Sequence, residues 1–374
     1  MSIPLAAADR MPPAIADVIY PTLVEGLPSL KGKCIAITGT TSGTGYWSAL
    51  AVAKKGASAL LLLNRQSERA VLADAQIAQE APDTKVISVV CDLSSFSSVR
   101  QAALTAKAHA TEFGGIDVLC CNAAIAQMPD SRTVDGYDIQ MQTNHLSHAL
   151  LVEELMPSLE AAANVRAEAR VVFHSSGARF FPFTTCEDFG GKHFKKSEPG
   201  TLGGDCSTMS LLSLKSAHSV RYNHSKLAMS TYAMALHDKL AAIGSKVKSI
   251  SAEPGAALTG LIDKGFHVSD GKRANSCALA LLVNVTVRFG MCQSGADGAC
   301  PLLFAACSSE VASGDFFAPS GVVTGLPCYA KGVPTKVVAA NMPVAGVKLS
   351  EENVLNKDYQ KASWEMTRLA IGSP

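Results

Sequence analysis

Residues 34–45 read CIAITGTTSGTG, and this stretch decides the fold. Its first five residues, Cys34 to Thr38, form a buried-looking run that predicts a strand covered on both faces. A glycine-rich turn at 39–45 follows, and residues 43–55 then have the pattern of a helix. Glycines at such a turn let the backbone approach a pyrophosphate, whose charge the helix N-terminus meets. The stretch predicts a dinucleotide-binding turn, and a strand–helix turn without a ligand is the alternative.

The chain on either side of this turn alternates between apolar strands and amphipathic helices. Further strands are predicted at 57–63, 86–90, 116–121, 170–174 and 247–251, with a short last strand at 315–318. Helices are predicted at 66–79, 95–111, 136–162 and 222–243. Strands that alternate with helices of this length imply right-handed crossovers. The sequence therefore predicts an α/β fold with a doubly wound, mostly parallel sheet of the Rossmann type.

The 374 residues allow one large domain or two small ones, at about 150 residues per domain. We expect an N-terminal arm at 1–30 with a short helix at 14–20, a single domain at 31–325, and a C-terminal extension at 326–374 packed on that domain. Residues 177–221 interrupt the alternation and are expected to be an insertion, because a connection this long is usually functional or disordered.

Composition excludes some classes of function. The 33 basic and 32 acidic side chains nearly cancel, which argues against a nucleic-acid partner bound through its phosphates and against a polybasic membrane anchor. The most apolar runs, 57–63 and 278–287, are shorter than the roughly 20 residues of a spanning helix. They read as a buried strand and a buried helix. No secretory signal is evident, so we expect no membrane span and a cytoplasmic location, with import into an organelle left open.

Eleven cysteines raise the question of a metal or disulfide site. The chain has no Cys-x-x-Cys and no cysteine–histidine cluster with zinc spacing. We therefore expect reduced, buried thiols and no metal.

Seven segments, the glycine turn and six others, resemble the short-chain dehydrogenase/reductase family. Residues 38–45 match TGxxxGxG, and Tyr222-Asn-His-Ser-Lys226 matches YxxxK. The other matches are Ser175-Ser176 at the end of the fifth strand, Asn144 in QTNHLSH, and the segments 91–93 (CDL), 121–124 (CNAA) and 254–259 (PGAALT). Residues 135–157, 298–307, 313–321 and 358–372 resemble the retinol dehydrogenase branch, and light-dependent protochlorophyllide oxidoreductases share these features.

The resemblance implies four catalytic residues: Asn144, Ser176, Tyr222 and Lys226. Tyr222 and Lys226 are four residues apart and share a helix face. An ammonium group near the phenol is expected to lower the pKa of Tyr222, which would suit it as a general acid or base. Ser176 would stabilise the developing alkoxide, and Asn144 would hold a water in a proton relay to Lys226.

Cofactor binding is expected along the carboxyl ends of the strands. Arg65 lies where an arginine would accommodate the NADP phosphate, and the nearest acid is Glu68. We therefore expect NADP(H), with the register of Asn64 and Arg65 open and a merely solvated Arg65 as the alternative. The expected contacts are Gly39, Thr41, Ser42, Gly43, Thr44, Gly45, Asn64, Arg65, Asp92, Leu93, Asn122, Ala123, Ala124, Tyr222, Lys226, Pro254, Gly255 and Thr259.

Two cofactor residues depart from the family pattern. Thr44 stands where an aliphatic residue is usual, and Ala124 stands where NNAG has its glycine. A methyl group at Ala124 is tolerable only if the backbone there is not left-handed.

The sequence favours an NADP(H)-dependent oxidoreductase that moves a hydride between nicotinamide and a carbonyl or alcohol carbon. Reduction of a conjugated C=C bond in a tetrapyrrole and a catalytically idle NADP-binding sensor or scaffold are the alternatives. Five of the 13 phenylalanines lie at 180–194, so the insertion is predicted either to cover an apolar substrate or to be pinned to the core by these rings. The expected partner is a small, apolar substrate, and the protein is expected to be a monomer or a homodimer.

Overall fold

The computed structural model describes residues 19–181, 189, 191–203, 217–257, 292–319, 327–330 and 352–373. These residues form one eight-stranded sheet in the order β3-β2-β1-β4-β5-β6-β7-β8. β7 and β8 pair antiparallel, and every other neighbouring pair is parallel. The doubly wound fold is thus confirmed. The strands are β1(Cys34–Thr38), β2(Ala59–Asn64), β3(Lys85–Val90), β4(Val118–Cys121), β5(Ala169–His174), β6(Val247–Ala252), β7(Phe316–Pro319) and β8(Pro327–Ala330).

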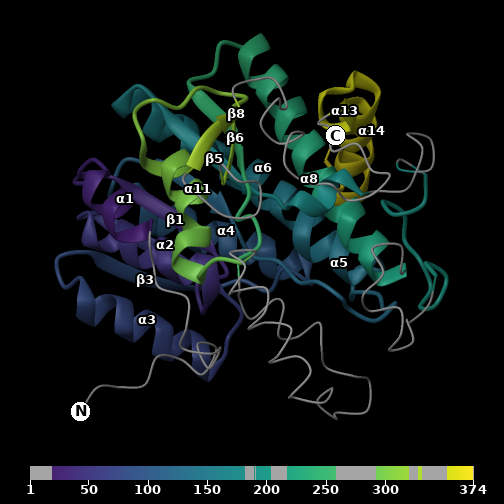
Figure 1. Cartoon of the computed structure of the whole chain (residues 1–374), viewed down its shortest axis with the longest axis horizontal. Coiled ribbons are helices and arrows are strands. Elements are labelled where there is room, and N and C mark those ends of the chain that lie inside the picture. The colour runs from purple at the N-terminus through teal and green to yellow at the C-terminus, as the bar shows by residue number, and fades with distance from the viewer. Residues whose placement is uncertain are drawn as a thin grey trace.

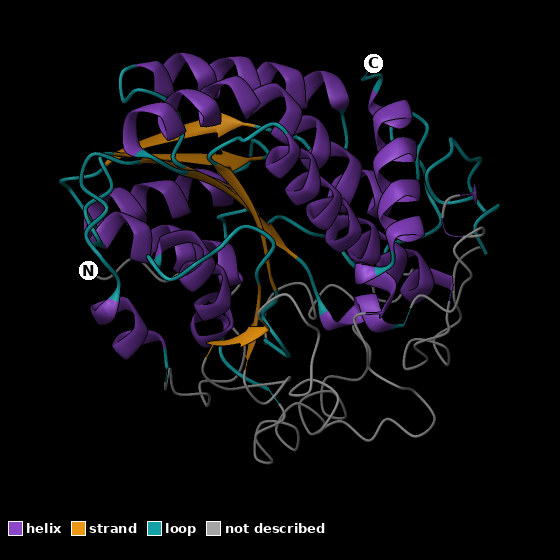
Figure 2. Cartoon of the chain, turned by 90° about the horizontal axis from the view of Figure 1, so that it is seen from above, coloured by secondary structure: helices purple, strands orange, loops and turns teal. Residues whose placement is uncertain are grey.

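Helices cover both faces of this sheet, which runs between them as a twisted middle layer (Figures 1 and 2). One apolar core lies beneath α1, α2 and α11, and a second lies beneath α4, α6 and α8. The bounds are α1(Tyr20–Gly26), α2(Gly43–Lys54), α3(Glu68–Glu80), α4(Phe96–Thr111), α5(Ile139–Met141), α6(Ser147–Arg166), α8(Ala217–Ala242), α11(Gly295–Cys307), α13(Glu352–Leu355) and α14(Lys357–Ile371).

The central strands are apolar because both of their faces are buried. Every residue of β1, β2 and β5 is buried, whereas most of the edge strand β3 is exposed or half-buried. Alternate side chains of β1 enter the two cores: Ala36 packs in one and Ile37 in the other. The continuous apolar runs in the sequence therefore correspond to parallel strands enclosed by helices.

The single helix predicted at 136–162 is wrong. Gly136 has a φ of +92°, and Asp138 then caps the short helix α5 by accepting hydrogen bonds from the N–H groups of Gln140 and Met141. A π-helical turn, η2(Gln142–Leu146), separates α5 from α6. Its residues have the same apolar spacing as an α-helix, so periodicity does not reveal the extra residue in the turn.

The first described helix begins at Tyr20, with Pro21 in its first turn, and extends to Gly26. Residues 14–18 of the helix expected at 14–20 lie outside the described residues. The helix expected at 222–243 begins earlier, at Ala217. The run at 278–287 lies outside the described residues.

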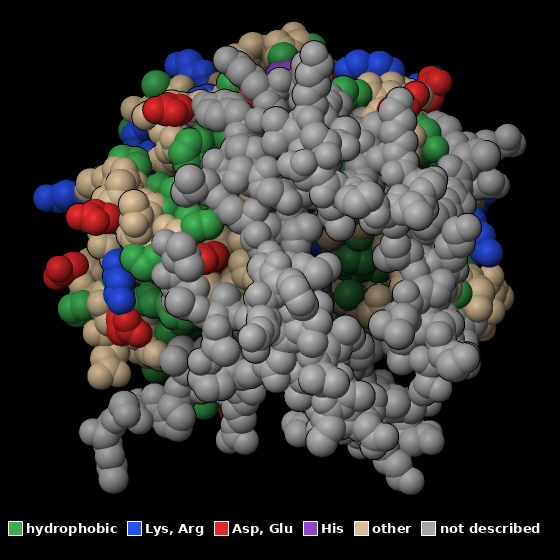
Figure 3. Space-filling model, in the orientation of Figure 1, with side chains coloured by type: hydrophobic (Ala, Val, Ile, Leu, Met, Phe, Trp, Pro, Cys, Tyr) green, Lys and Arg blue, Asp and Glu red, His purple; other side chains and the backbone are tan. Residues whose placement is uncertain are grey.

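Segments at the two ends of the described chain pack on this framework. Asp297 in α11 accepts hydrogen bonds from the N–H groups of Ile19 and Tyr20, both at 2.9 Å. α13 and α14 lie against α8. None of the helices in the described ranges is both long enough and apolar enough to span a bilayer. The visible described surface in Figure 3 intersperses charges of both signs, in keeping with the net charge of +1.

Candidate active site

The glycine turn brings the end of β1 against the start of α2. Gly39 has a φ of +73°, and a Cβ on Gly45 would lie 2.1 Å from the Gly39 carbonyl oxygen. This spacing is too close for any side chain, so the position requires glycine. No acceptor within the described protein takes the N–H groups of residues 41–45. Free N–H groups at a helix N-terminus fit an anionic pyrophosphate.

Asn122, directly after β4, holds this turn with its whole amide group. Its Nδ2 donates to the carbonyls of Thr38 (2.9 Å) and Gly39 (3.2 Å). Its Oδ1 accepts from Thr44 Oγ1 (3.0 Å) and from His174 Nδ1 (2.7 Å). The unusual Thr44 therefore bonds Asn122 instead of adding an apolar contact, and His174 is a site residue that the motifs did not indicate.

The second departure from the family pattern is accommodated by the backbone. The non-glycine residues with positive φ in the described chain are Gln127 and Ala167, so Ala124 is not left-handed. Gly39, in turn, leaves room for the neighbouring Ala123, whose Cβ would be 2.7 Å from a Cβ at position 39. The CNAA segment thus fits beside the turn without strain at Ala124.

Asn64 and Arg65 at the end of β2 have different surroundings. Asn64 is buried, and its Oδ1 and Nδ2 bond the N–H and hydroxyl groups of Thr40 at 2.8 and 2.7 Å. Arg65 is exposed. Arg69, at the start of α3, was not predicted from the sequence. It is half-buried and donates to the Ser42 hydroxyl and to the Thr41 carbonyl.

The segment after β3 is also ordered by local hydrogen bonds. Asp92 Oδ1 accepts from the N–H and hydroxyl groups of Ser94, and Leu93 is buried. The Leu93 carbonyl accepts from Ser147 Oγ at 2.7 Å, which ties this segment to α6. Both residues thus lie at the carboxyl end of the sheet, where ligands of such folds bind.

Ser176, Tyr222 and Lys226 come together beyond the carboxyl end of β5. Ser176 favours the ionised form of the Tyr222 phenol and so opposes a rise in its pKa. Lys226 Nζ lies 5.9 Å from the centre of the Tyr222 ring and donates to the His174 carbonyl at 2.8 Å. One helical turn separates Tyr222 from Lys226 on α8, so the predicted shared face is present.

The expected direction of the Tyr222 pKa is wrong for the protein alone. Burial raises the pKa of Tyr222 to about 12; Ser176 opposes this rise, and the charge of Glu253 adds to it. Lys226 does not reverse the shift, because burial lowers its own pKa to about 7 and its ammonium is directed to a carbonyl. The phenol is therefore the form that Tyr222 takes at neutral pH.

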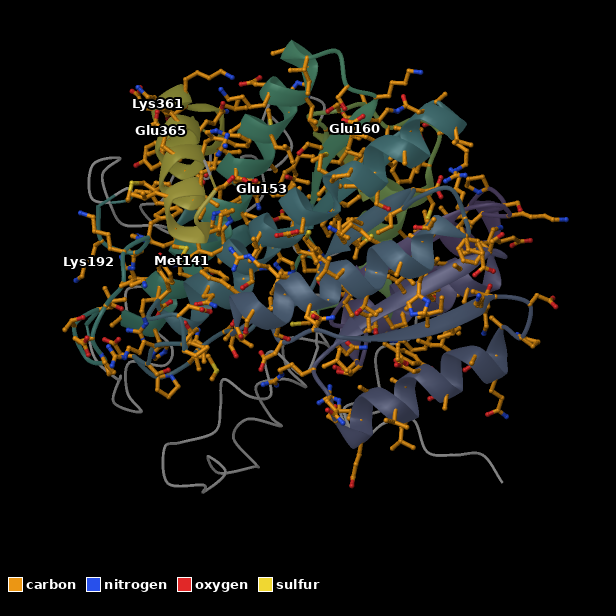
Figure 4. All side chains as sticks on the ribbon, turned by 180° about the vertical axis from the view of Figure 1, so that it is seen from behind. Met141, Glu153, Glu160, Lys192, Lys361 and Glu365 are labelled. Atoms are coloured by element: carbon orange, nitrogen blue, oxygen red, sulfur yellow. The ribbon has the colours of Figure 1, made fainter. Side chains whose placement is uncertain are left out.

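Asn144 lies in the π-helical turn η2, directly after Met141 (Figure 4). Its amide is bonded on three sides: Oδ1 accepts from Ile125 N, and Nδ2 donates to Ile125 O and Ser225 Oγ, at 2.8 to 2.9 Å. These contacts tie the loop after β4 to the residue before Lys226. The water relay stays a prediction.

The loop after β6 supplies the remaining predicted contacts. Gly255 has a φ of +62°, and the Pro254 carbonyl accepts from Gln293 Nε2. Thr259 lies outside the described residues. Glu253, between β6 and Pro254, is buried and paired with Arg179, and sequence reasoning missed both. An acidic residue directly after a buried strand was the available signal.

The described part of the insertion is attached to α8 and α14. Phe189 is fully buried and contacts Phe194, His224 and Tyr359 with ring centres 5.2 to 6.0 Å apart. Lys192 points away from the body of the protein in Figure 4. Phe180 is also buried, and Phe181 is half-buried. Phe183 lies outside the described residues. The buried rings favour pinning of this part of the insertion.

Comparisons with known proteins agree with this geometry. Residues 33–190 match the short chain dehydrogenase model. An uncharacterized oxidoreductase of Schizosaccharomyces pombe is 33% identical over 238 residues, which are 63% of each chain. Residues 33–190 are therefore similar to the short-chain dehydrogenases.

Other relatives agree with the expected branch. Polyprenol dehydrogenase of Danio rerio is 26% identical over 86% of this chain and 89% of its own length. Protochlorophyllide reductase of Chlamydomonas reinhardtii is 32% identical over 46% of this chain and 43% of its own. A solved structure of an uncharacterized protein from Mycobacterium paratuberculosis has the same fold, with a TM-score of 0.62 at 22% identity over 94% of this chain and 97% of that one. The chain spans less than two thirds of the length of the fission yeast and algal relatives.

Proposed function

We propose that this protein is an NADP(H)-dependent oxidoreductase acting on a carbonyl or alcohol carbon. The observation that carries the proposal is the placing of Tyr222 and Lys226 together, with Lys226 Nζ 5.9 Å from the centre of the Tyr222 ring, at the sheet edge that also holds Ser176 and the glycine turn. The free N–H groups of residues 41–45 would take the pyrophosphate, and Lys226 would hold the nicotinamide ribose. When bound, the nicotinamide supplies or accepts a hydride.

Side chains of this protein would transfer the proton that the substrate oxygen gains or loses. Tyr222 would exchange its phenolic proton with the substrate oxygen, because a phenol is the form present at neutral pH. The Ser176 hydroxyl would donate a hydrogen bond to the same oxygen and stabilise negative charge that develops there. Lys226, with a pKa lowered to about 7, would be able to pass protons between Tyr222 and solvent.

We further propose an apolar substrate and the phosphorylated dinucleotide. Polyprenol dehydrogenase, which aligns over 86% of this chain, is named for an isoprenoid alcohol. Arg65 and Arg69 follow β2, where an arginine can bind the NADP phosphate. A tetrapyrrole is the second candidate substrate, supported by the match to a protochlorophyllide reductase.

A substrate screen with Tyr222→Phe tests the proposal. Oxidation of NADPH is followed by absorbance with aldehydes and ketones of increasing apolar size and with protochlorophyllide, with NADH as the cofactor control. Loss of the proton donor should lower kcat about 10²- to 10⁴-fold and leave NADPH affinity unchanged. Tyr232→Phe is the matched control, because Tyr232 is a buried tyrosine on the same helix and packs on Trp364.

Three outcomes are informative. Turnover of carbonyl compounds that disappears in Tyr222→Phe supports the proposal. Light-dependent reduction of the pigment alone would replace it with the tetrapyrrole candidate. NADPH binding without turnover of any compound would favour a sensor or scaffold.

A further inference from the structure

The ring of His148, in the first turn of α6, lies between the glycine turn and the π-helical turn η2. The side chain is completely buried, and burial lowers its pKa to about 4. Both ring nitrogens are hydrogen-bonded: Nδ1 lies 2.8 Å from the Asn144 carbonyl oxygen, and Nε2 lies 2.9 Å from Thr38 Oγ1. Thr38 ends β1, and Asn144 lies in η2. His148 therefore contacts both halves of the candidate site.

The partners of His148 determine which nitrogen carries the ring hydrogen. A backbone carbonyl only accepts, so Nδ1 must donate its hydrogen to Asn144. The Thr38 hydroxyl oxygen already accepts from the backbone N–H groups of Asn122 at 2.9 Å and Ala123 at 3.0 Å. These two bonds use both of its lone pairs, so Thr38 must donate its own hydrogen to Nε2. The geometry thus selects the Nδ1–H tautomer.

The same geometry excludes a protonated ring. An imidazolium would donate from both nitrogens, and the Thr38 oxygen would then have to accept three N–H groups with two lone pairs. The Thr38 hydrogen would be left with the Cys120 carbonyl at 3.4 Å, which is farther away than His148 Nε2 at 2.9 Å. The neutral ring is therefore the form that satisfies all of these groups.

His148 closes a ring of hydrogen bonds around the loop after β4. One end of this loop is held by Thr38, which accepts from the Ala123 N–H. The other end is held by Asn144, whose amide exchanges two hydrogen bonds with the backbone of Ile125 at 2.8 and 2.9 Å. Because His148 joins Thr38 to Asn144, the two ends of the loop are held in one frame.

The Thr38 end of this frame supports the glycine turn. The backbone N–H of Asn122 donates to Thr38, and the Asn122 amide bonds the Gly39 carbonyl and the Thr44 hydroxyl. The N–H groups of residues 41–45, which would take the pyrophosphate, belong to the same turn. A displaced Thr38 hydroxyl would therefore disturb the groups that bind the dinucleotide.

The Asn144 end of the frame supports the helix that carries Tyr222. Asn144 Nδ2 donates to Ser225 Oγ at 2.9 Å, and Ser225 Oγ donates to the Tyr222 carbonyl at 2.7 Å. Ser225 directly precedes Lys226. A displaced Asn144 would therefore disturb the backbone beneath both Tyr222 and Lys226.

Filling space does not require a histidine at this position. A buried imidazole costs free energy that its hydrogen bonds must offset, whereas an apolar side chain of similar size would have no such cost. The nearby His145 offers a comparison, because it is equally buried and its Nε2 bonds Thr367 of α14 instead. The two imidazoles thus differ in what they hold and not in burial.

We propose that His148 is a positioning residue that, as the Nδ1–H tautomer, holds the glycine turn through Thr38 and the Tyr222 helix through Asn144. The proposal rests on the proposed function. The bond at Nε2 supports binding of the dinucleotide, and the bond at Nδ1 supports proton transfer by Tyr222. Substitutions that keep one bond and remove the other should therefore have opposite effects on NADPH affinity and on kcat.

Two substitutions separate these bonds. His148→Asn places an amide nitrogen where Nδ1 lies and keeps the bond to Asn144, whereas His148→Gln places an amide oxygen where Nε2 lies and keeps the bond to Thr38. His148→Asn should weaken NADPH about 3- to 10-fold, as expected for one lost hydrogen bond, and leave kcat at saturating NADPH within about twofold. His148→Gln should lower kcat by a similar factor and leave the affinity within about twofold. Fluorescence titration measures the affinity, and NADPH oxidation with an active carbonyl substrate measures kcat.

His145→Leu is the matched control for His148→Leu, because each removes one buried imidazole. Both variants should be less stable in urea, but His148→Leu should also weaken NADPH and lower kcat, and His145→Leu should change neither. Equal changes of affinity and kcat in His148→Asn and His148→Gln would overturn the proposal. Unchanged affinity and kcat in folded His148→Leu would overturn it as well.

The tautomer is tested in the unsubstituted protein. In protein with ¹⁵N-labelled histidine, the chemical shifts of the ring nitrogens distinguish a protonated nitrogen from a bare one. The His148 signals are assigned by their absence from any folded His148 variant. A hydrogen on Nδ1 and none on Nε2 at pH 7 is the expected result. A hydrogen on Nε2 overturns the proposal.

The affinity measurement separates this proposal from the proposed function. A protein that turns over no carbonyl compound would overturn the proposed function, and NADPH binding would still test His148. Weaker binding by His148→Asn than by His148→Gln would then support the bond to Thr38 as the support of the glycine turn. Equal binding by the two variants would overturn the positioning role.

Discussion

Arg65 and Arg69 both follow β2, but they differ in exposure and in the contacts that they make. Arg65 is exposed, whereas Arg69 bonds Thr41 and Ser42 of the glycine turn. Removing Arg65 therefore leaves the glycine turn intact. Removing Arg69 leaves the Thr41 carbonyl and the Ser42 hydroxyl without the hydrogen bonds that it donates. The two substitutions separate recognition of a phosphate from support of the turn.

Arg65→Ala is expected to weaken NADPH about 10- to 150-fold and leave NADH unchanged, because a charge-assisted hydrogen bond contributes roughly 1.5–3 kcal/mol. Arg69→Ala is expected to weaken both dinucleotides, since both need the glycine turn. Titration of each variant with NADPH and NADH measures this. Equal weakening of the two cofactors in Arg65→Ala would contradict the phosphate assignment.

At the scale of elements, the insertion and α14 support each other across α8. Phe189 contacts His224 of α8 and Tyr359 of α14. The inner face of α14 is further attached by Ser363, which donates to the Ala228 carbonyl at 3.0 Å, while Lys361 and Glu365 point outward (Figure 4). The helix that carries Tyr222 is thus enclosed by two segments distant in sequence.

Phe189→Ala should lower the free energy of unfolding by about 3–5 kcal/mol, because it leaves a cavity in a fully buried cluster. Urea denaturation measures the loss. Lys195→Ala, at an exposed position in the same insertion, is the control and should change stability by less than about 0.5 kcal/mol. A small loss in Phe189→Ala, together with a raised KM for large apolar substrates, would instead indicate a ring that covers substrate.

The order of strands and the glycine turn could be predicted because apolar runs and glycine spacing are local signals. The π-helical turn at 142–146 could not, because one added residue leaves the apolar spacing of a helix almost unchanged. Arg69, His174 and Glu253 were missed because their importance depends on contacts across the sheet. The Tyr222 pKa was predicted in the wrong direction because sequence spacing shows the nearby lysine and not the burial.

Several histidine side chains are buried in different parts of the molecule. Burial lowers the pKa values of His145, His148, His174 and His193 from 6.5 to about 3 or 4. Folding therefore keeps them neutral at pH values where the unfolded chain would bind protons. These groups come from η2, α6, β5 and the insertion, so the effect belongs to the fold and not to one site.

The free energy of unfolding should consequently fall as the pH drops from 6 to 5. Each buried histidine stabilises the fold above its unfolded pKa of 6.5 and contributes a loss of about 1.4 kcal/mol per pH unit below it. Asp138 has the opposite effect, because its pKa is raised to about 6 in the folded protein. Between pH 6 and 5 the folded protein therefore binds a proton on Asp138 that the unfolded chain does not bind, which offsets the loss from one histidine.

Urea denaturation at pH 7, 6 and 5 measures the slope. His193→Leu should reduce the slope of the free energy of unfolding against pH by the contribution of one histidine. His109→Gln, at an exposed position, should leave the slope unchanged. A stability that stays level between pH 7 and 5 would contradict the buried neutral state of these histidines.

The place of β1 in the sheet also constrains the route by which the chain folds. β1 pairs with β2 on one side and with β4 on the other. During synthesis, residues 34–38 are made well before residues 118–121, so an emerging chain has one unpaired, mostly apolar strand edge until β4 is made. Such an edge is a template for pairing with other chains. Translation speed between these two strands, and chaperones that bind extended apolar segments, should therefore influence the yield of native protein more than they influence its final stability.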